Sequence, residues 1–300
     1  MVTWVLPGCG VAQTDVVSNI EEKLSGIKNI TVNGGPLEVS FEGSPQATEV
    51  FLNAYLESNN SGYKITYKVE GDHLRVNLVQ EGYSGWGNRR IKGFISLTGP
   101  ETMNLEINSG SGPMYVSHVN SGRIDLSTSS GVIEAKTLRS DSIHVKASSG
   151  HMDVEEIYGR LFCRASSGGG VISRVEGDLS LVASSGGYRI SKVQGVVNAS
   201  LSSGSIDMED VSELGALTVS SGGIRAVRAG LGASTRFSGS SGSFDIQTEG
   251  NLGGFNYDLS ASSGSLQVGD TKTVRKLYLN NNAAQTVSGS TSSGSILIRN

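Results

Sequence analysis

The sequence predicts an all-β protein: a single-stranded parallel β-helix (β-solenoid) of about 18 residues per coil, with a β-rich N-terminal cap. The first observation is the tripeptide Ser-Ser-Gly, which occurs nine times from residue 129 onwards. Its glycines lie 18 to 22 residues apart, except for a last interval of 30. They are Gly131, Gly150, Gly168, Gly186, Gly204, Gly222, Gly242, Gly264 and Gly294. A repeat of this length indicates one structural unit that is stacked many times.

The second observation is the alternation of apolar residues around each triplet. The second and fourth residues after the glycine are mostly apolar, and so are the fifth and seventh residues before it. Period-two alternation in short runs bounded by glycine is typical of β-strands. Each unit therefore holds two main strands, which are separated by a second glycine turn at Gly159, Gly177 and Gly195.

The third observation is that the unit is too short for helical crossovers between parallel strands. Coiling the chain, so that each strand pairs with its equivalent one turn away, joins the apolar columns into one core.

The composition of 41 Gly and 5 Pro residues suits many tight turns. A net charge of −4 offers no basic footprint for nucleic acid. The chain has no run of 18 apolar residues that would cross a membrane as a helix.

The two cysteines have different expected roles. Residues 1–9 end in Leu6-Pro7-Gly8-Cys9, which resembles a bacterial lipobox, so we interpret 1–9 as a remnant of a lipoprotein signal peptide with Cys9 as the lipidation site. A plain N-terminal strand is the alternative, and a gene start placed too far downstream would explain the missing basic region. Cys163 shares an inward column with Val145 and Leu181, so we expect a buried thiol and no disulfide.

Residues 10–107 lack the triplet and are predicted to form a β cap that continues into the repeats of 108–300. The cap covers strand ends that would otherwise be open for pairing. Its expected elements are two strands in 27–41, a strand or short helix at 48–56, a hairpin at 63–79, a polar loop at 80–90, strands at 91–97 and 103–107, and a degenerate triplet at 108–112.

Three segments carry a family resemblance. Residues 99–107 (Gly-Pro-Glu-Thr-Met-Asn-Leu-Glu-Ile), 120–126 (Asn-Ser-Gly-Arg-Ile-Asp-Leu) and the Ser-Ser-Gly series resemble a bacterial family of putative adhesins of unknown function, related to the head-GIN domain of autotransporter adhesins. The resemblance covers about residues 27–300. It implies a β-solenoid at the cell envelope and names no common ligand, so any function drawn from it is analogy of fold.

The third residue after each triplet glycine forms an outward row in which to look for chemistry. The row reads Glu134, Asp153, Val171, Arg189, Asp207, Arg225, Asp245 and Gln267. From Arg189 to Asp245 the signs alternate, which is typical of a ladder of opposite charges between stacked strands. Glu134 and Asp153 are neighbours of like charge, with His151 and His144 nearby. This patch is a candidate cation site or acid/base group. The serines lack the setting of a nucleophile, and we expect no catalytic residue, metal or cofactor.

Two interruptions of the pattern are candidate contact sites. The loop of 80–90 carries Tyr83, Trp86, Arg89 and Arg90, which suit stacking on a sugar and pairing with a carboxylate; the alternative is a loop folded onto the cap. The spacing of the last triplets puts extra residues at 250–254 and 271–285, and within the second range residues 280–285 (Asn-Asn-Asn-Ala-Ala-Gln) predict a polar loop that bulges from the last coils.

The sequence as a whole favours an exported, non-catalytic protein of the cell envelope, or a cell-surface lipoprotein, that serves as an adhesin or scaffold. The expected partners are glycans, host-matrix proteins or envelope proteins, with no nucleic acid and with membrane contact only through a lipid anchor. The alternative is a carbohydrate-active β-helix that binds or cleaves polysaccharide.

Overall fold

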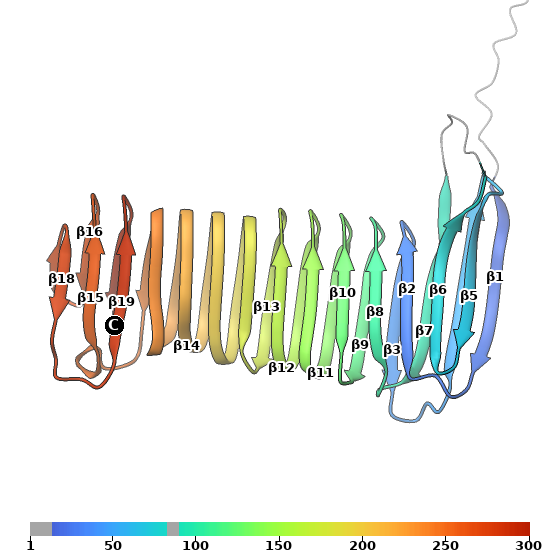
Figure 1. Cartoon of the computed structure of the whole chain (residues 1–300), viewed down its shortest axis with the longest axis horizontal. Helices are drawn as coiled ribbons and strands as arrows, with labels where there is room; N and C mark the ends of the chain where they lie inside the picture. The colour runs from blue at the N-terminus through green and yellow to red at the C-terminus, as the bar shows by residue number, and fades with distance from the viewer. Residues whose placement is uncertain (1–13, 83–89) are drawn as a thin grey trace, which may run out of the picture.

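The computed structural model describes residues 14–82 and 90–300. The chain is all-β, and its strands form a single mixed, mostly parallel sheet that runs the length of a rod (Figure 1). Within these residues, no helix is long and apolar enough to cross a membrane. The strands are β1 Asp15–Leu24, β2 Asn29–Gly35, β3 Glu38–Ser44, β4 Val50–Ser58, β5 Tyr63–Glu70, β6 His73–Gln80, β7 Ile91–Pro100, β8 Asn104–Ser109, β9 Met114–Asn120, β10 Ile124–Thr128, β11 Val132–Ala147, β12 His151–Ala165, β13 Gly169–Glu176, β14 Leu179–Gln247, β15 Asn256–Ala261, β16 Ser265–Val268, β17 Thr271–Thr273, β18 Lys276–Leu279, β19 Thr286–Thr291 and β20 Ser295–Arg299.

The middle of the rod has the parallel register that the repeat predicts. Ile133 pairs with Met152, and Met152 pairs with Gly170, so the chain returns to the same place after 18 or 19 residues. β14 alone covers several such turns (Figure 1). Side chains that alternate along each strand point into the rod and form one continuous apolar core. The predicted inward columns are therefore confirmed.

The Ser-Ser-Gly corners stack through the backbone. The amide of Ser149 donates to the carbonyl of Ser129, and that of Ser167 donates to Ser148, both over 2.7 Å. From Gly131 to Gly222, the glycine of each corner lies directly against the glycine carbonyl of the preceding coil, so that a methyl group on Gly186 would overlap the oxygen of Gly168. Only glycine allows this approach, because it has no Cβ.

A second corner, six residues after each triplet glycine from Gly131 to Gly222, was not expected from the sequence. Residues with ordinary side chains adopt a left-handed conformation there, with φ between 50° and 58° in Thr137, Glu156, Arg174, Lys192 and Arg228 among others. The expected glycine turn follows three residues later, and Gly159 and Gly177 also have positive φ. Each coil therefore bends at three places, and the predicted two strands per unit are joined by a short segment between the second and third bends.

Two buried side chains stand out in this core. Cys163 is 2% exposed, as predicted, and burial raises the pKa of its thiol to about 12. Tyr188 is also 2% exposed, and its hydroxyl has no hydrogen-bond partner among the described residues. Its ring is accommodated because the preceding coil has Gly170 at this position, where a Cβ would lie 3.4 Å from the ring. Burial also raises the pKa of the Tyr188 hydroxyl.

The N-terminal end departs from chain order. β2 pairs in parallel with both β6 and β8, and β3 pairs in parallel with both β7 and β9. The first coil is thus inserted between two later ones, as the blue ribbon between cyan and green shows (Figure 1). Beyond β6 and β7 the strands turn antiparallel: β5 pairs with β6, β4 with β7, and β1 with β4. The expected hairpin of 63–79 is confirmed, and 48–56 is a strand.

The C-terminal end of the rod also contains an inserted coil and antiparallel strands. β19 and β20 lie between β14 on one side and β15 and β16 on the other, so the last coil is inserted as well (Figure 1). The predicted polar loop at 280–285 is confirmed, because these residues follow β18 and lie outside the strands. The earlier part of the inserted range 271–285 forms two short strands. β17 and β18 pair antiparallel with β16 and β15 and cover the end of the stack. Residues 250–254 form a short 3-10 turn, Leu252–Gly254.

Gly186→Ala tests the stacked corner. The added methyl group meets the Gly168 carbonyl at a φ of 128° that L-residues rarely adopt. We expect the free energy of unfolding to fall by roughly 3 kcal/mol, measured by urea denaturation followed by circular dichroism. Gly187→Ala is the matched control, because the nearest atom to its Cβ is the Ser205 hydroxyl at 3.9 Å. Equal loss in both variants would contradict this account.

Tyr188→Phe tests the unpartnered hydroxyl. Removing a buried polar group that forms no hydrogen bond should raise the free energy of unfolding by about 1 kcal/mol. Tyr257→Phe should lower it by a similar amount, because the equally buried Tyr257 donates to the carbonyl of Leu252 over 3.0 Å. Urea midpoints of the two variants should move in opposite directions. A parallel shift would show that the Tyr188 hydroxyl has a partner.

Candidate functional site

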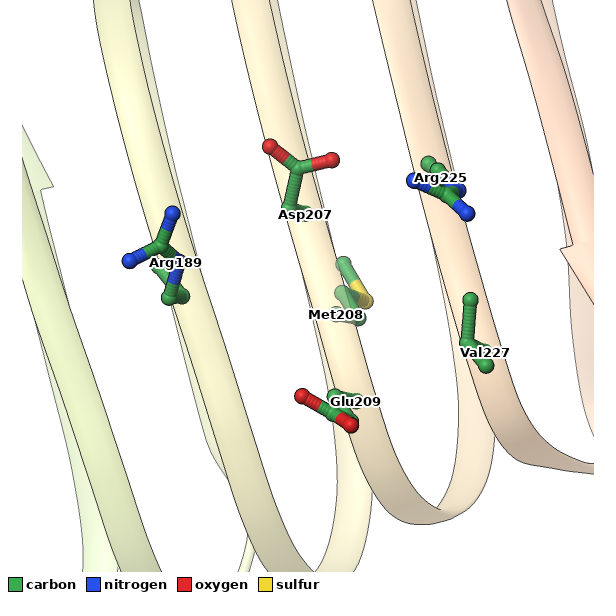
Figure 2. Close-up of a pocket in the computed structure, with 6 residues that line it drawn as sticks. All are labelled: Arg189, Asp207, Met208, Glu209, Arg225 and Val227. Carbon is green, nitrogen blue, oxygen red and sulfur yellow. The ribbon is translucent and has the colours of Figure 1, made fainter.

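A charged depression lies on the face made by the strands that follow the Ser-Ser-Gly corners. Arg189, Asp207 and Arg225 occupy three successive turns of β14, and Glu209 lies beside them (Figure 2). The depression has a volume of about 380 Å³, and Met208 is one of the residues that line it. All the charged side chains project outward because the residues between them, such as Met208, fill the core.

The alternating charges of this row do not form the ladder of ion pairs that the sequence predicts. Arg189 and Arg225 make no ion pair with any carboxylate in the described part of the chain. Asp245, the next member of the row, pairs with Arg299 over 3.1 Å, and Arg299 comes from the inserted last coil. The two free guanidinium groups could receive a carboxylate or sulfate from a ligand.

The ion pairs gather at the left-handed corner instead. Arg174 binds Glu155 and Glu156 of the preceding coil, and Lys136 approaches Glu155 from the other side at 3.3 Å. Hydrogen bonds from Thr137 and then Arg174 lower the pKa of Glu156. These groups are partly exposed, so each pair contributes little to stability. Both carboxylates, Glu155 and Glu156, nevertheless have a basic side chain as a partner.

The same arrangement recurs farther along the rod. Arg228 binds Glu209 and Asp210, with 2.6 Å from its Nε to Asp210. The hydrogen bond from Arg228 lowers the pKa of the Asp210 carboxyl and raises that of the guanidinium. We call the residues Lys136, Glu155, Glu156, Arg174, Glu209, Asp210 and Arg228 the corner ladder.

The predicted acidic patch is assembled only in part. Glu134 and Asp153 are register neighbours, and His151 lies two residues before Asp153 on the same exposed face. His144 is not near them, contrary to expectation, because it lies on the other side of the second corner and pairs with Phe162. No group of three or more His, Cys, Asp or Glu side chains in residues 14–82 and 90–300 could hold a metal ion.

The predicted loop contacts lie largely outside the described residues. This is the case for Tyr83, Trp86 and Arg89, and also for Cys9 at the N-terminus. Arg90 is exposed, and its backbone amide donates to the Asn59 side chain over 3.0 Å. The end of the loop is thereby held beside the end of β4.

A group of side chains on the opposite face was missed by sequence reasoning. The rings of His144 and Phe162 stack with centroids 4.9 Å apart and planes inclined by 12°. Lys146 and Arg164 are register neighbours beside them. The residues of each pair are 18 apart in the chain, so only the register of the coils brings them together.

The architecture defines the class of protein: an all-β repeat rod of stacked, mostly parallel strands with charged and polar outer faces. The family model for the toastrack family DUF4097 matches residues 27–299, and the chain belongs to that family. The suspected family relationship is confirmed in this form.

Solved structures of similar proteins carry adhesin descriptions. A putative adhesin from Bacteroides fragilis is 12% identical, with 94% of this chain and 97% of that chain covered and a TM-score of 0.42. A putative adhesin from Parabacteroides distasonis is 11% identical, with 94% and 97% covered and a TM-score of 0.43. A putative adhesin from Parabacteroides merdae is 9% identical, with 94% of this chain and 96% of that chain covered and a TM-score of 0.39. No protein of curated function matches.

Proposed function

We propose that this chain is a non-catalytic protein of the bacterial cell envelope that acts as an adhesin or surface scaffold. Its coils form a single-stranded β-solenoid of about 18 residues per coil, a description supported by the parallel pairing of residues 18 or 19 apart. Membership of the toastrack family supports the proposal at the level of fold. The partners we propose are glycans, host-matrix proteins or envelope proteins.

The observation that carries the proposal is the distribution of charge. Catalysis by paired carboxylates needs them to converge on one bond in a sheltered site. In this rod the corner ladder neutralises carboxylates with cations on neighbouring coils, and the other charged rows spread along open faces. Flat, rigid faces with many repeated positions suit contact with an extended partner.

The first experiment separates an adhesin from a carbohydrate-active enzyme. The full chain should bind some members of a panel of immobilised glycans and matrix proteins, and should release no reducing ends from soluble polysaccharides supplied with Ca²⁺. Asp153→Asn should leave binding within about twofold, because this carboxylate lies outside the proposed contacts. Product formation that Asp153→Asn abolishes would replace the adhesin with an enzyme acting through Glu134, His151 and Asp153.

A second experiment tests the lipid anchor that the sequence suggests at Cys9. A lipidated cysteine would tether the rod by its N-terminal end, with triacylation giving firm attachment. In bacterial cells fed labelled palmitate, the chain should incorporate label and fractionate with membranes. Cys9→Ala should lose both properties, whereas Cys163→Ala, which removes the buried thiol, should keep them. Label that persists in Cys9→Ala would refute the lipoprotein proposal.

A further inference from the structure

A strip of basic and aromatic side chains lies on the strands that lead into the Ser-Ser-Gly corners, whereas the charged depression lies on the strands that follow these corners. We define the basic strip as Lys146, Arg160, Phe162 and Arg164, with His144 beneath Phe162. These residues come from the second halves of β11 and β12, and their side chains point away from the core residues Val145, Leu161 and Cys163. Neighbouring positions on adjacent strands are about 4.8 Å apart.

The cations of the basic strip form no ion pair with residues 14–82 or 90–300. Lys146 and Arg164 are register neighbours of like charge, an arrangement that destabilises a sheet. Neither they nor Arg160 make an ion pair or hydrogen bond through their side chains with any described residue. The corner ladder of the same coils shows the contrast, because there Arg174 binds two carboxylates.

Two carboxylates in the rows of the strip have partners of their own. Asp125 precedes His144 in its row and forms an ion pair with Arg123. Asp178 follows Arg160 on the next coil, and its carboxylate accepts the backbone amide of Val196 over 2.9 Å. Asp141 directly precedes Ser142, the register neighbour of Arg160, and makes no ion pair with a described residue. None of these three carboxylates pairs with Lys146, Arg160 or Arg164 in the described part of the chain.

An aromatic surface lies between these cations. The Phe162 side chain is 37% exposed, although the other residues of its row near the middle of the rod are polar or small. One face of its ring rests on His144, whose Nε2 is 2.9 Å from the Ser142 hydroxyl and is thereby held in place. The register neighbour on the other side is Ser180, which is too small to cover the ring. The second ring face is therefore open.

We propose that the basic strip binds an acidic polysaccharide. A sugar ring would place its C–H face on Phe162, while its carboxylate or sulfate groups would be bound by Arg164 with Lys146 or Arg160. Arginine binds such oxyanions through two parallel hydrogen bonds. An acidic peptide has charge without the flat apolar ring. A single-stranded nucleic acid would need aromatic residues for successive bases, and the strip offers one exposed phenyl ring.

This inference rests on the proposed surface function and specifies its ligand class. The test is isothermal titration calorimetry of the full chain with two acidic probes: tetragalacturonate, which carries carboxylates, and a heparin tetrasaccharide, which also carries sulfates. Maltotetraose is the neutral control, and tetraglutamate and hexathymidylate represent the other polyanions. We expect at least one acidic sugar to bind and its affinity to fall as NaCl is raised, because salt screens exposed charges. Maltotetraose should not bind.

The variants locate the site. Arg164→Gln and Lys146→Gln should each weaken binding of the acidic sugar about tenfold or more, the effect of losing one charge-assisted hydrogen bond. Phe162→Ser, which copies the residue of the next coil, should also weaken binding about tenfold. Arg236→Gln is the matched control, since it removes an exposed cation farther along the rod. Its affinity should stay within about twofold of the unsubstituted chain.

Three outcomes would overturn the inference: no binding of either acidic sugar, unchanged affinity in Phe162→Ser and Arg164→Gln, or equal affinity for tetraglutamate or hexathymidylate. Thermal melts would show that the exposed substitutions leave folding intact. Adhesion to the panel that persists in the strip variants would refute the basic strip alone and leave the adhesin proposal standing. Loss of all binding in the unsubstituted chain would refute both.

Discussion

The close approach of backbone to backbone at the Ser-Ser-Gly corners is the constraint on which the rod depends. From Gly131 to Gly222, each corner glycine lies against the glycine carbonyl of the preceding coil, and adjacent serine amides donate along the stack. Any side chain at this point would push neighbouring coils apart and break the pairing on both sides of the corner. The coil length therefore has to stay near 18 residues between corners, and the inward columns stay in register as a consequence.

Stacked parallel strands leave an open edge at each end, and the chain closes both edges in the same way. The first and last coils, β2–β3 and β19–β20, are inserted among their neighbours, and antiparallel strands cover what remains. Antiparallel strands follow one another through short turns, so they can end a stack without starting another coil. Insertion also places the end of the chain inside the sheet, where it pairs on both sides.

Sequence periodicity could predict the middle of the rod because each inward residue there repeats at the coil length. It could not predict the order of coils at the ends, since the same apolar pattern fits a strand in either position. The left-handed corner was also hidden, because ordinary residues such as Glu156, Arg174 and Lys192 adopt it and no glycine marks it. The pattern could place acidic and basic residues on outer faces, but it could not predict which of them form ion pairs. Arg174, for example, pairs with Glu155 and Glu156 of the preceding coil and not with the residue in its own row alone.

The outer faces differ in how far the protein satisfies its own charges. At the left-handed corner each cation of the ladder forms an ion pair with carboxylates on a neighbouring coil. At the basic strip, cations lie side by side with an exposed ring between them, and they have no ion-pair partner among the residues that the structure describes. Because core and corners are sufficient to hold the coils in place, outward side chains are free to serve contacts with other molecules. Unneutralised charge on such a scaffold costs stability and offers nothing to the fold, and for that reason it marks the face most suited to a ligand of opposite charge.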